Sequence, residues 1–353
     1  MTLTATVAAL ALGLAPAGAA QITGSECREL ELRRAKPMMA TLVVVTVRGC
    51  ADGGLEERVR EAFAEGARLS AMLSEWDPAS PVSLLDTRAG LEPVRVPTEL
   101  FEVLEAALGV SELTGGAFDV TWAPLGEAWR FDGASPPRLP PTEQVERLRA
   151  LVGHRHLILD PAARTAFLDR PGMRIGLGGI AKGYIAAAMA DLLVRRGVRD
   201  VLVAASGDIA ARGRNGRRPW TVAVRDPRVP SRLRALVELH DESISTSGDY
   251  ERFFVLEGRR YSHILDPATG RPAQGTTSVT VVGSDGAMVD ALATGLFVLG
   301  SERGAAPLHK LPDVSALFID EDGSVHIVGN ARRFGAVRES ASAPAESTPG
   351  AAR

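Results

Sequence analysis

The sequence predicts a mixed α/β fold of the α+β type, in which strand-helix units form two closely packed halves of one domain with a site between them. Two observations predict this fold. Runs of β-branched residues alternate with apolar residues at helical spacing in both halves of the chain. The chain also has 353 residues, 45% hydrophobic and 24% charged, which is long enough to bury a large core.

The first half opens with a strand and continues with helices. A β-branched run over 39–47 predicts a buried strand. Helices are expected over 55–73, 99–113 and 142–152, where apolar residues recur every three or four positions, and glycines follow the last two. The apolar runs 157–159 and 165–168, separated by Asp160-Pro161, predict a hairpin.

The second half repeats the pattern. A helix over 180–196, closed by Gly197, is expected to lead into a strand over 201–204. Strands dominate 220–283, with Glu257-Gly258 as a hairpin turn. A helix over 287–299 is expected to end at Gly300, before a hairpin of 316–319 with 325–328.

The two ends of the chain are expected to lie outside the domain. An apolar run over 7–20 ends in Ala17-Gly-Ala19, which is typical of a cleaved signal peptide over 1–20, although no Lys or Arg precedes it. We therefore expect an exported, periplasmic protein, with a linker over 21–36, the domain over 37–336 and a disordered tail over 337–353.

Charge and cysteine content exclude several classes of site. The net charge of −3 offers no basic surface for nucleic acid, so no nucleic-acid partner is expected. Two cysteines, Cys27 and Cys50, cannot form a disulfide framework or a thiolate metal cage. A single bridge and two unpaired thiols are both open.

A glycine-rich turn over 176–183 precedes the expected helix at 180. Glycines there let a ligand approach the backbone, and the free N–H groups of a helix N-terminus suit a phosphate. The alternative is a turn that packs a helix closely on a strand. Because Lys182 is followed by Gly183, the segment is not a P-loop, and its spacing is not that of a dinucleotide fingerprint.

Two carboxylates are further candidates. Asp290 and Thr294 lie four residues apart, so they share a helix face and could present oxygens to Mg²⁺; a solvated Asp with a Thr bonded to its own helix is the alternative. Asp119 follows Gly115-Gly116 in a polar turn. It suits recognition of a ring N–H or a ribose hydroxyl, and an Asx-turn explains it equally well.

His263 is the best candidate for a general base among the six histidines. It lies in the polar segment 260–271, between Tyr261-Ser262 and Asp266-Pro267, where a turn could hold a substrate hydroxyl nearby. A structural turn histidine is the alternative.

Taken together, these segments resemble the ApbE family of FAD:protein FMN transferases over about 37–336. The likeness rests on stretches that occur in the order typical of the family: 39–41, 73–80, 114–119, 177–184, 205–209, 245–250, 261–271 and 290–294. The resemblance implies one catalytic domain that transfers FMN from FAD to a Thr or Ser hydroxyl of a target protein and releases AMP, with Mg²⁺ as cofactor. The target expected from the family is a membrane or exported redox subunit.

The resemblance also implies roles for individual residues. It places the Ala181 carbonyl, the Asp290 carboxylate and the Thr294 hydroxyl around Mg²⁺, and His263 as the base. The residues that it places around FAD are Met39, Glu75, Trp76, Asp77, Ala117, Phe118 and Asp119 at the flavin, Gly178 and Tyr184 beside the phosphates, Lys182, and His263 and Ile264 near the reacting centre.

Two alternatives use the same site: a Mg²⁺-dependent FAD pyrophosphatase that yields FMN and AMP, and a periplasmic flavin-binding protein without turnover. The sequence departs from the family at two positions. Gly176 stands where an Asp is common, and Ser206-Gly207 replaces a double glycine. These departures affect the expected positions of loops and none of the expected metal ligands.

Overall fold

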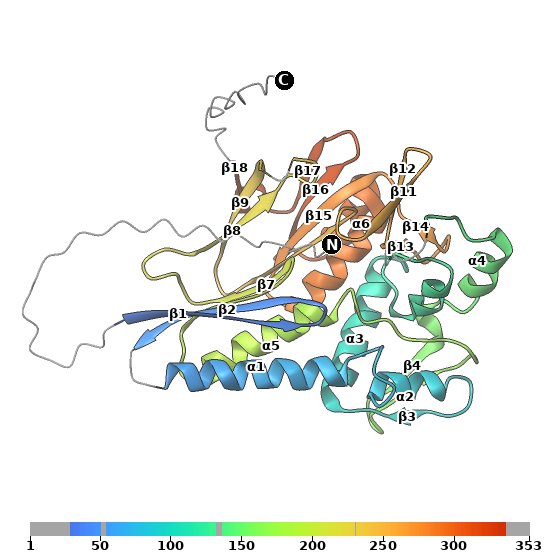
Figure 1. Ribbon diagram of the computed structural model, residues 1–353, viewed down its shortest axis with the longest axis horizontal. Helices are drawn as coiled ribbons and strands as arrows, with labels where there is room; N and C mark the ends of the chain where they lie inside the picture. Colours follow the sequence, from blue (N-terminus) through green and yellow to red (C-terminus); the bar gives the residue numbers. More distant parts are fainter. Residues whose placement is uncertain (1–28, 51–53, 132–135, 230, 337–353) are drawn as a thin grey trace, which may run out of the picture.

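A computed structural model describes residues 29–50, 54–131, 136–229 and 231–336 (Figure 1). Its first half contains two long strands, four α-helices, two 3₁₀ helices and a small sheet. The elements are β1 Glu29–Met38, β2 Thr41–Cys50, α1 Leu55–Met72, α2 Pro81–Thr87, β3 Val94–Arg95, α3 Thr98–Leu113, η1 Val120–Glu127, α4 Thr142–Arg149, η2 His154–His156, β4 Leu157–Asp160 and β5 Thr165–Leu168.

The second half carries most of the strands. Its elements are α5 Ala181–Arg195, β6 Asp200–Ala205, β7 Asp208–Arg212, β8 Trp220–Arg225, β9 Leu233–Leu239, β10 Ser243–Gly248, β11 Phe253–Leu256, β12 Arg259–Ser262, β13 Leu265–Asp266, β14 Arg271–Pro272, β15 Thr276–Gly283, α6 Gly286–Leu308, β16 Ser315–Asp320, β17 Val325–Val328, η3 Ala331–Arg333 and β18 Phe334–Ala336.

An eight-stranded sheet in the order β1-β2-β6-β7-β10-β15-β16-β17 forms the framework, and every neighbouring pair is antiparallel. Helices α5 and α6 pack on one face, and the small sheet β18-β9-β8 covers the other (Figure 1). Strand β15 is buried along its whole length because both faces are covered. Its Val281 faces the helices, whereas Val282 faces the small sheet.

The helical first half joins this framework through a shared core. One hydrophobic cluster includes Val43 of the sheet, Leu104 of α3, Leu168 of β5 and Leu296 of α6. Within that cluster, Phe118 packs so closely on α6 that a Cβ at Gly295 would lie 2.9 Å from the Phe118 Cβ. The predicted mixed α/β fold is confirmed, with the two halves built on one core.

Several predicted boundaries need correction. The expected linker 21–36 is a strand from residue 29 onward, because Glu29–Met38 pairs with Thr41–Cys50. The strand expected to begin at Met39 begins at Thr41, since Met39 and Ala40 form the hairpin turn. The helix expected to end at Gly300 does end there, because Gly300 has φ 75° and ψ 173°, outside the helical region, and a second helical stretch then runs to Leu308. The predicted signal peptide 1–20 and tail 337–353 lie outside the described residues.

Other expectations are confirmed. Glu257 and Gly258 form the β11–β12 turn with φ of 51° and 77°, as a two-residue hairpin requires. The hairpin β4–β5 and the hairpin β16–β17 have the expected pairing. Cys50 is disulfide-bonded, which decides between the two alternatives for that residue. Among the described helices, none combines the length and apolar character needed to cross a membrane.

The N-termini of α5 and α6 cross in direct backbone contact. A Cβ at Gly183 would lie 2.1 Å from the Gly286 carbonyl oxygen, and a Cβ at Gly286 would lie 2.5 Å from the Gly183 oxygen. Only glycine fits at either position. The crossing lets the Gly183 N–H donate to Asp290 Oδ2 at 2.9 Å, so it places a carboxylate at the start of α5.

Replacing Gly183 should therefore destabilise the protein. Gly183→Ala forces α5 and α6 apart, and we expect the free energy of unfolding to fall by about 1–3 kcal/mol in urea denaturation. Gly109→Ala is the matched control, because Gly109 is inside α3 with open space around its Cβ, and it should stabilise by about 0.5–1 kcal/mol. Equal effects of the two substitutions would show that the crossing is not tight.

Candidate active site

A buried cluster of opposite charges lies where α5, α6 and β7 meet. Lys182 Nζ is 2.6 Å from Asp208 Oδ2 and 3.8 Å from Asp290 Oδ2. Asp208 and Asp290 are 3% and 2% exposed, whereas the Lys182 side chain reaches solvent. Ser245 Oγ donates to Asp208 Oδ1 at 2.6 Å. One ammonium group thus compensates two carboxylates that water cannot reach.

Asp290 is the less well compensated of the two carboxylates. Burial, reinforced by the nearby charge of Asp208, raises the pKa of Asp290 to about 7, although Lys182 and the Gly183 N–H oppose this shift. Its Oδ2 accepts from the Gly183 N–H at 2.9 Å, and its other close side-chain partner is Asp208, itself a carboxylate. An additional cation beside Asp290 would satisfy this buried carboxylate.

The neighbouring oxygens suit a hard divalent cation. Thr294 lies one helical turn beyond Asp290 on α6, and its Oγ1 is 3.3 Å from Ser247 Oγ. Ala181 is the first residue of α5, next to Lys182. A carboxylate, a hydroxyl and a carbonyl are all oxygen donors, and a Mg²⁺ site typically has few protein ligands because substrate phosphates supply others. The three residues implied by the resemblance therefore fit Mg²⁺.

The glycine turn before α5 leaves room for a ligand on one side and packs tightly on the other. A Cβ at Gly178 would touch nothing within 4 Å, whereas one at Gly179 would lie 3.0 Å from Thr294 Oγ1. The N-cap residue of α5, Ile180, has no side chain that caps the helix, and Asp290 accepts from the Gly183 N–H in the first turn. The sequence left phosphate binding and close packing as alternatives, and the geometry of Gly178 and Gly179 is compatible with both at once.

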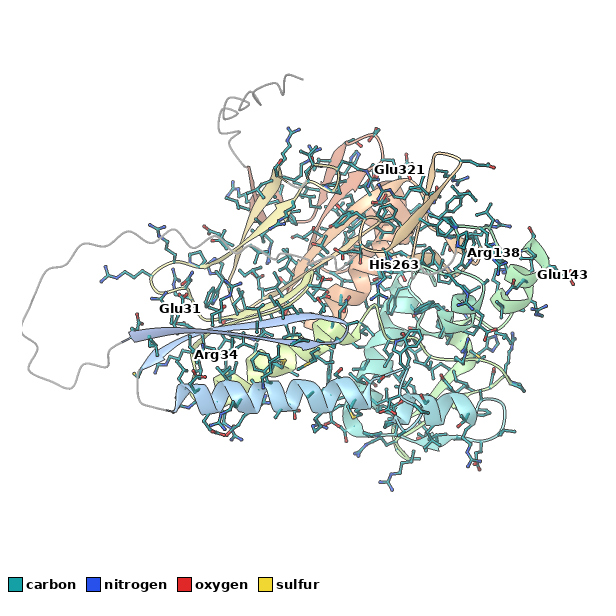
Figure 2. The ribbon with its side chains drawn as sticks, viewed as in Figure 1. Glu31, Arg34, Arg138, Glu143, His263 and Glu321 are labelled. Atoms are coloured by element: carbon teal, nitrogen blue, oxygen red, sulfur yellow. The ribbon has the colours of Figure 1, made fainter. Side chains whose placement is uncertain are left out.

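His263 lies near the middle of the molecule, at the end of β12 (Figure 2). Its backbone N–H and its ring Nδ1 both contact the Arg252 carbonyl oxygen, at 3.0 and 3.2 Å. A carbonyl only accepts hydrogen bonds, so Nδ1 carries the proton and Nε2 keeps its lone pair. Burial lowers the pKa of His263 to about 4, with smaller effects of Arg252 and Lys182. The imidazole is therefore neutral near pH 7.

Glu75 reaches the glycine turn from the segment after α1. Its Oε2 accepts from the Leu177 N–H at 3.1 Å, and burial raises its pKa to about 7. A Cβ at Gly176 would lie 2.9 Å from this oxygen and 2.6 Å from Trp122 Nε1. Where the family resemblance leads one to expect an Asp at position 176, the Glu75 carboxylate occupies the space beside Gly176. The neighbouring Trp76 is 84% exposed, and Asp77 is also exposed.

Asp119 uses its carboxylate to hold its own turn and to bind the start of η2. Oδ1 accepts from the Thr121 backbone and hydroxyl, at 2.8 and 2.6 Å, and Oδ2 accepts from the His154 N–H at 2.6 Å. The Asx-turn alternative is therefore confirmed for this residue. Ala117 and Phe118 are buried beside it. Contact of these residues with a flavin stays a prediction.

The remaining predicted residues are distributed around the cluster. Ile264 is buried directly after His263. The Tyr184 hydroxyl lies 3.4 Å from Glu102 Oε2 on α3, and burial with this neighbour raises its pKa to about 12. Met39 and Ala40 both have positive φ, 53° and 55°, which costs about 1 kcal/mol or more per residue. Positive φ at both residues is the geometry that a two-residue hairpin turn requires.

Asp208 is the main residue of the site that the sequence did not single out. It lies at the start of β7, within the stretch 205–209 that carried part of the family resemblance. Its signal in the sequence was a carboxylate between apolar residues, which needs a partner when buried. The partner, Lys182, is 26 residues away, so only the fold reveals the pair.

Asp208 should govern the stability of the cluster. Asp208→Asn leaves the Lys182 ammonium with only the more distant Asp290, and we expect the free energy of unfolding to fall by about 2–3 kcal/mol in urea denaturation. Ser245→Ala is the matched control, because it removes a hydrogen bond to Asp208 without changing the charge, and it should cost about 1 kcal/mol. If Asp208→Asn lowers the free energy of unfolding less than Ser245→Ala does, the ion pair of Lys182 and Asp208 does not stabilise the cluster.

Comparison with known proteins identifies the family of this chain. The family model described as "ApbE family" matches residues 39–318. A Vibrio cholerae protein described as "FAD:protein FMN transferase" is 37% identical, with 66% of this chain and 71% of that protein covered. A Treponema pallidum protein with the same description is 35% identical, covering 86% of this chain and 88% of its own.

Solved structures show the same fold. The flavin transferase ApbE from Vibrio cholerae has a TM-score of 0.76 at 30% identity and covers 87% of this chain and 100% of its own. The ApbE protein of Thermotoga maritima has a TM-score of 0.75 at 31% identity and covers 85% of this chain and 97% of its own. With its sequence and its fold both matching, the chain belongs to the ApbE family.

Proposed function

We propose that this protein transfers FMN from FAD to a Thr or Ser hydroxyl of a target protein and releases AMP, with Mg²⁺ as cofactor. The observation that carries the proposal is the cluster of Lys182, Asp208 and Asp290 at the N-terminus of α5, with a neutral histidine nearby. Relatives that cover most of the chain are described as FAD:protein FMN transferases, which supports the proposal.

Ala181, Asp290 and Thr294 would hold Mg²⁺. Bound there, the cation supplies charge compensation for the pyrophosphate of FAD and for the leaving AMP. Lys182 adds a fixed positive charge beside the same phosphates, because Asp208 holds its ammonium in one place. The open space at Gly178 lets the phosphates approach the start of α5.

His263 acts as the general base. The target hydroxyl donates its proton to Nε2 while its oxygen bonds to the FMN-side phosphorus, and the bond between that phosphorus and the AMP oxygen breaks. The Arg252 carbonyl holds the ring in the tautomer that this step needs. A pKa of about 4 is low for a base, but the negative charge of bound FAD phosphates raises the pKa of a nearby imidazole.

The target and the compartment form part of the proposal. The apolar N-terminal run supports export to the periplasm, and a target in that compartment would be an exported or membrane-anchored redox subunit with a short Thr- or Ser-containing segment. Mass spectrometry of protein purified from the cell envelope tests the location, because a cleaved signal peptide shifts the N-terminus of the mature chain.

One assay tests the activity. The protein is incubated with FAD, Mg²⁺ and a carrier protein fused to a short uncharged segment with one threonine. A flavin-fluorescent carrier band after denaturing electrophoresis, absent when that threonine is valine, supports transfer. Free FMN without a labelled carrier would instead identify a pyrophosphatase, and unchanged FAD would identify a binding protein.

Replacing His263 should separate catalysis from binding. His263→Ala removes the base, so we expect transfer to fall at least about 100-fold from pH 6 to 9, with the Kd for FAD unchanged within about threefold. Transfer assays quenched at fixed times measure the rate, and titration of FAD fluorescence measures the Kd. His240→Ala, an exposed histidine, is the control. Full transfer by His263→Ala would refute the assignment of the base.

Removing the cation and removing its carboxylate ligand should both abolish transfer. EDTA is expected to stop transfer by the wild-type protein, and added Mg²⁺ should restore it. Asp290→Asn should be inactive at any Mg²⁺ concentration, because it removes the only carboxylate among the three ligands. Asp191→Asn, which removes the surface partner of Arg212, should behave like wild type. Mg²⁺-dependent turnover by Asp290→Asn would discard this ligand set.

A further inference from the structure

The hairpin β11–β12 stands apart from the other strands of the described structure and leads directly to His263. Its two strands form a sheet of their own. The Arg252 carbonyl, just before β11, receives both hydrogen bonds that hold His263. A hydroxyl that reaches His263 Nε2 must therefore come close to the base of this hairpin.

One face of the hairpin is fixed to the protein by stacked aromatic rings. Phe254 and Tyr261, opposite each other, have ring centroids 5.1 Å apart. Phe131 stacks on Phe254 at 5.6 Å, and Trp129 stacks on Tyr261 at 6.4 Å. Trp129 is itself buried and donates to the Gly270 carbonyl. This contact keeps the hairpin rigid and turns its other face outward.

The outward face carries apolar side chains. Phe253 and Val255 alternate with Phe254, and they are 39% and 51% exposed. The Arg260 guanidinium lies over the Phe253 ring, 3.8 Å from its centroid. Large apolar side chains at this exposure, next to a reacting centre, are typical of a surface that is covered when a partner binds.

The main chain of β11 also has a free edge. The bond from His263 N–H to the opposite Arg252 carbonyl marks a hydrogen-bonded pair, and such pairs alternate along an antiparallel ladder. Phe254 and Leu256 therefore bond to β12, whereas the N–H and C=O groups of Phe253 and Val255 point away from it. No other described strand pairs with β11.

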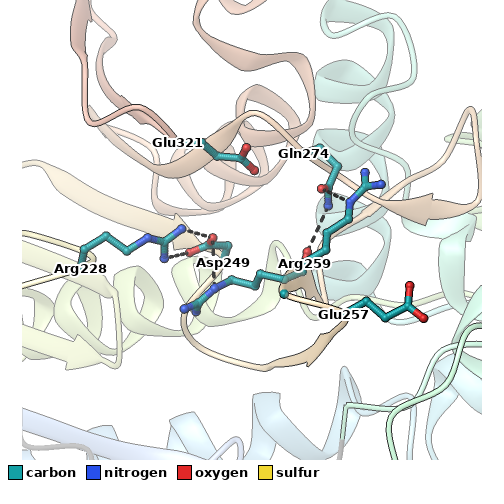
Figure 3. A pocket seen from close by; sticks show the side chains of 8 residues that line it. Arg228, Asp249, Glu257, Arg259, Gln274 and Glu321 are labelled. Atoms are coloured by element: carbon teal, nitrogen blue, oxygen red, sulfur yellow. Dashed lines mark hydrogen bonds and ion pairs between the residues drawn. The ribbon is translucent and has the colours of Figure 1, made fainter.

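A polar cavity of about 660 Å³ adjoins this hairpin (Figure 3). Asp249 accepts two hydrogen bonds from Arg228, and Arg259 Nε donates to Gln274 Oε1. The six charged residues of its lining are three arginines and three carboxylates, namely Arg228, Arg259, Arg260, Asp249, Glu257 and Glu321. The balance favours a polar segment without net charge.

Other strand edges in the described structure lack this combination. The outer edge of β1 has five charged residues and Pro37 among its ten, a composition that opposes strand pairing. Strand β17 exposes Val325 and Ile327, but the hydrogen bonds that hold His263 go to Arg252, beside β11. Of these three edges, that of β11 combines an apolar face, a free edge and a link to the proposed base.

We propose that the target protein binds as an extended, uncharged segment along the free edge of β11, with its hydroxyl residue at the His263 end. Arg260, opposite Val255, is three positions before His263, about 10 Å along a strand, so a short segment can contact Phe253 and Val255 and still reach the proposed base. Main-chain pairing supplies affinity, and the outward side chains and the cavity supply selectivity. This inference rests on the proposed transferase function.

Substitutions at Val255 test the inference. Val255→Pro removes the outward N–H without breaking a bond of the hairpin, and Val255→Asp keeps that N–H but places a charge on the apolar face. Both should raise the KM for the threonine-bearing carrier protein about tenfold or more. Val255→Thr, which keeps the N–H and suits a strand, should stay within about twofold.

Two measurements separate docking from misfolding. The near-UV circular dichroism of the aromatic stack reports whether the hairpin is intact, and the Kd for FAD reports the other substrate; both should match wild type. If Val255→Pro loses the near-UV signal of the aromatic stack, its hairpin is not intact, and the KM of Val255→Asp is then the test of docking. An intact Val255→Asp with the wild-type KM overturns the docking site while wild-type transfer upholds the function. No transfer by the wild-type protein overturns both.

Discussion

The close crossing of α5 and α6 is the constraint on which the site depends. Gly183 and Gly286 have no side chains, so the two backbones touch and the first turn of α5 receives the Asp290 carboxylate. Asp290 would otherwise be a buried charge with no donor except a lysine 3.8 Å away. The packing of the fold and the chemistry of the site therefore use the same contact, and neither glycine can vary independently of the other.

The site has two buried carboxylates and one ammonium group, so a bound cation would balance its charge. Lys182 is shared between Asp208 and Asp290, and burial holds the pKa of Asp290 near 7. Within the described residues the deficit is positive charge, which suits a divalent cation brought with a phosphate-bearing substrate. Near the same cluster, His263 is neutral because burial opposes its protonation. A neutral imidazole and a buried carboxylate with too little positive charge beside it are the two features that the proposed reaction would use.

The sequence predicted features that depend on local residue patterns. It did not predict contacts between residues that lie far apart in the chain. The helix over Leu55–Met72 and the Glu257-Gly258 turn followed from spacing and turn chemistry, and both are confirmed. The helix end at Gly300 also followed from a glycine after an apolar stripe, and the positive φ of Gly300 confirms it, although a second helical stretch follows. The role of Asp208 could not be predicted from spacing, since its partner lies 26 residues away on another element. Whether FAD contacts Met39 or Trp76 stays a prediction.

The hairpin β11–β12 joins the position of the base to the surface on which a target would bind. Arg252 is both the residue before β11 and the acceptor of the His263 ring, so any movement of β11 relative to β12 would also disturb the tautomer and direction of the imidazole. The stack of Trp129, Phe131, Phe254 and Tyr261 opposes such movement by fixing the hairpin to the helical half. A rigid hairpin costs little conformational entropy when a segment pairs with its edge. The same rigidity that positions the base thus favours binding of an extended target beside it.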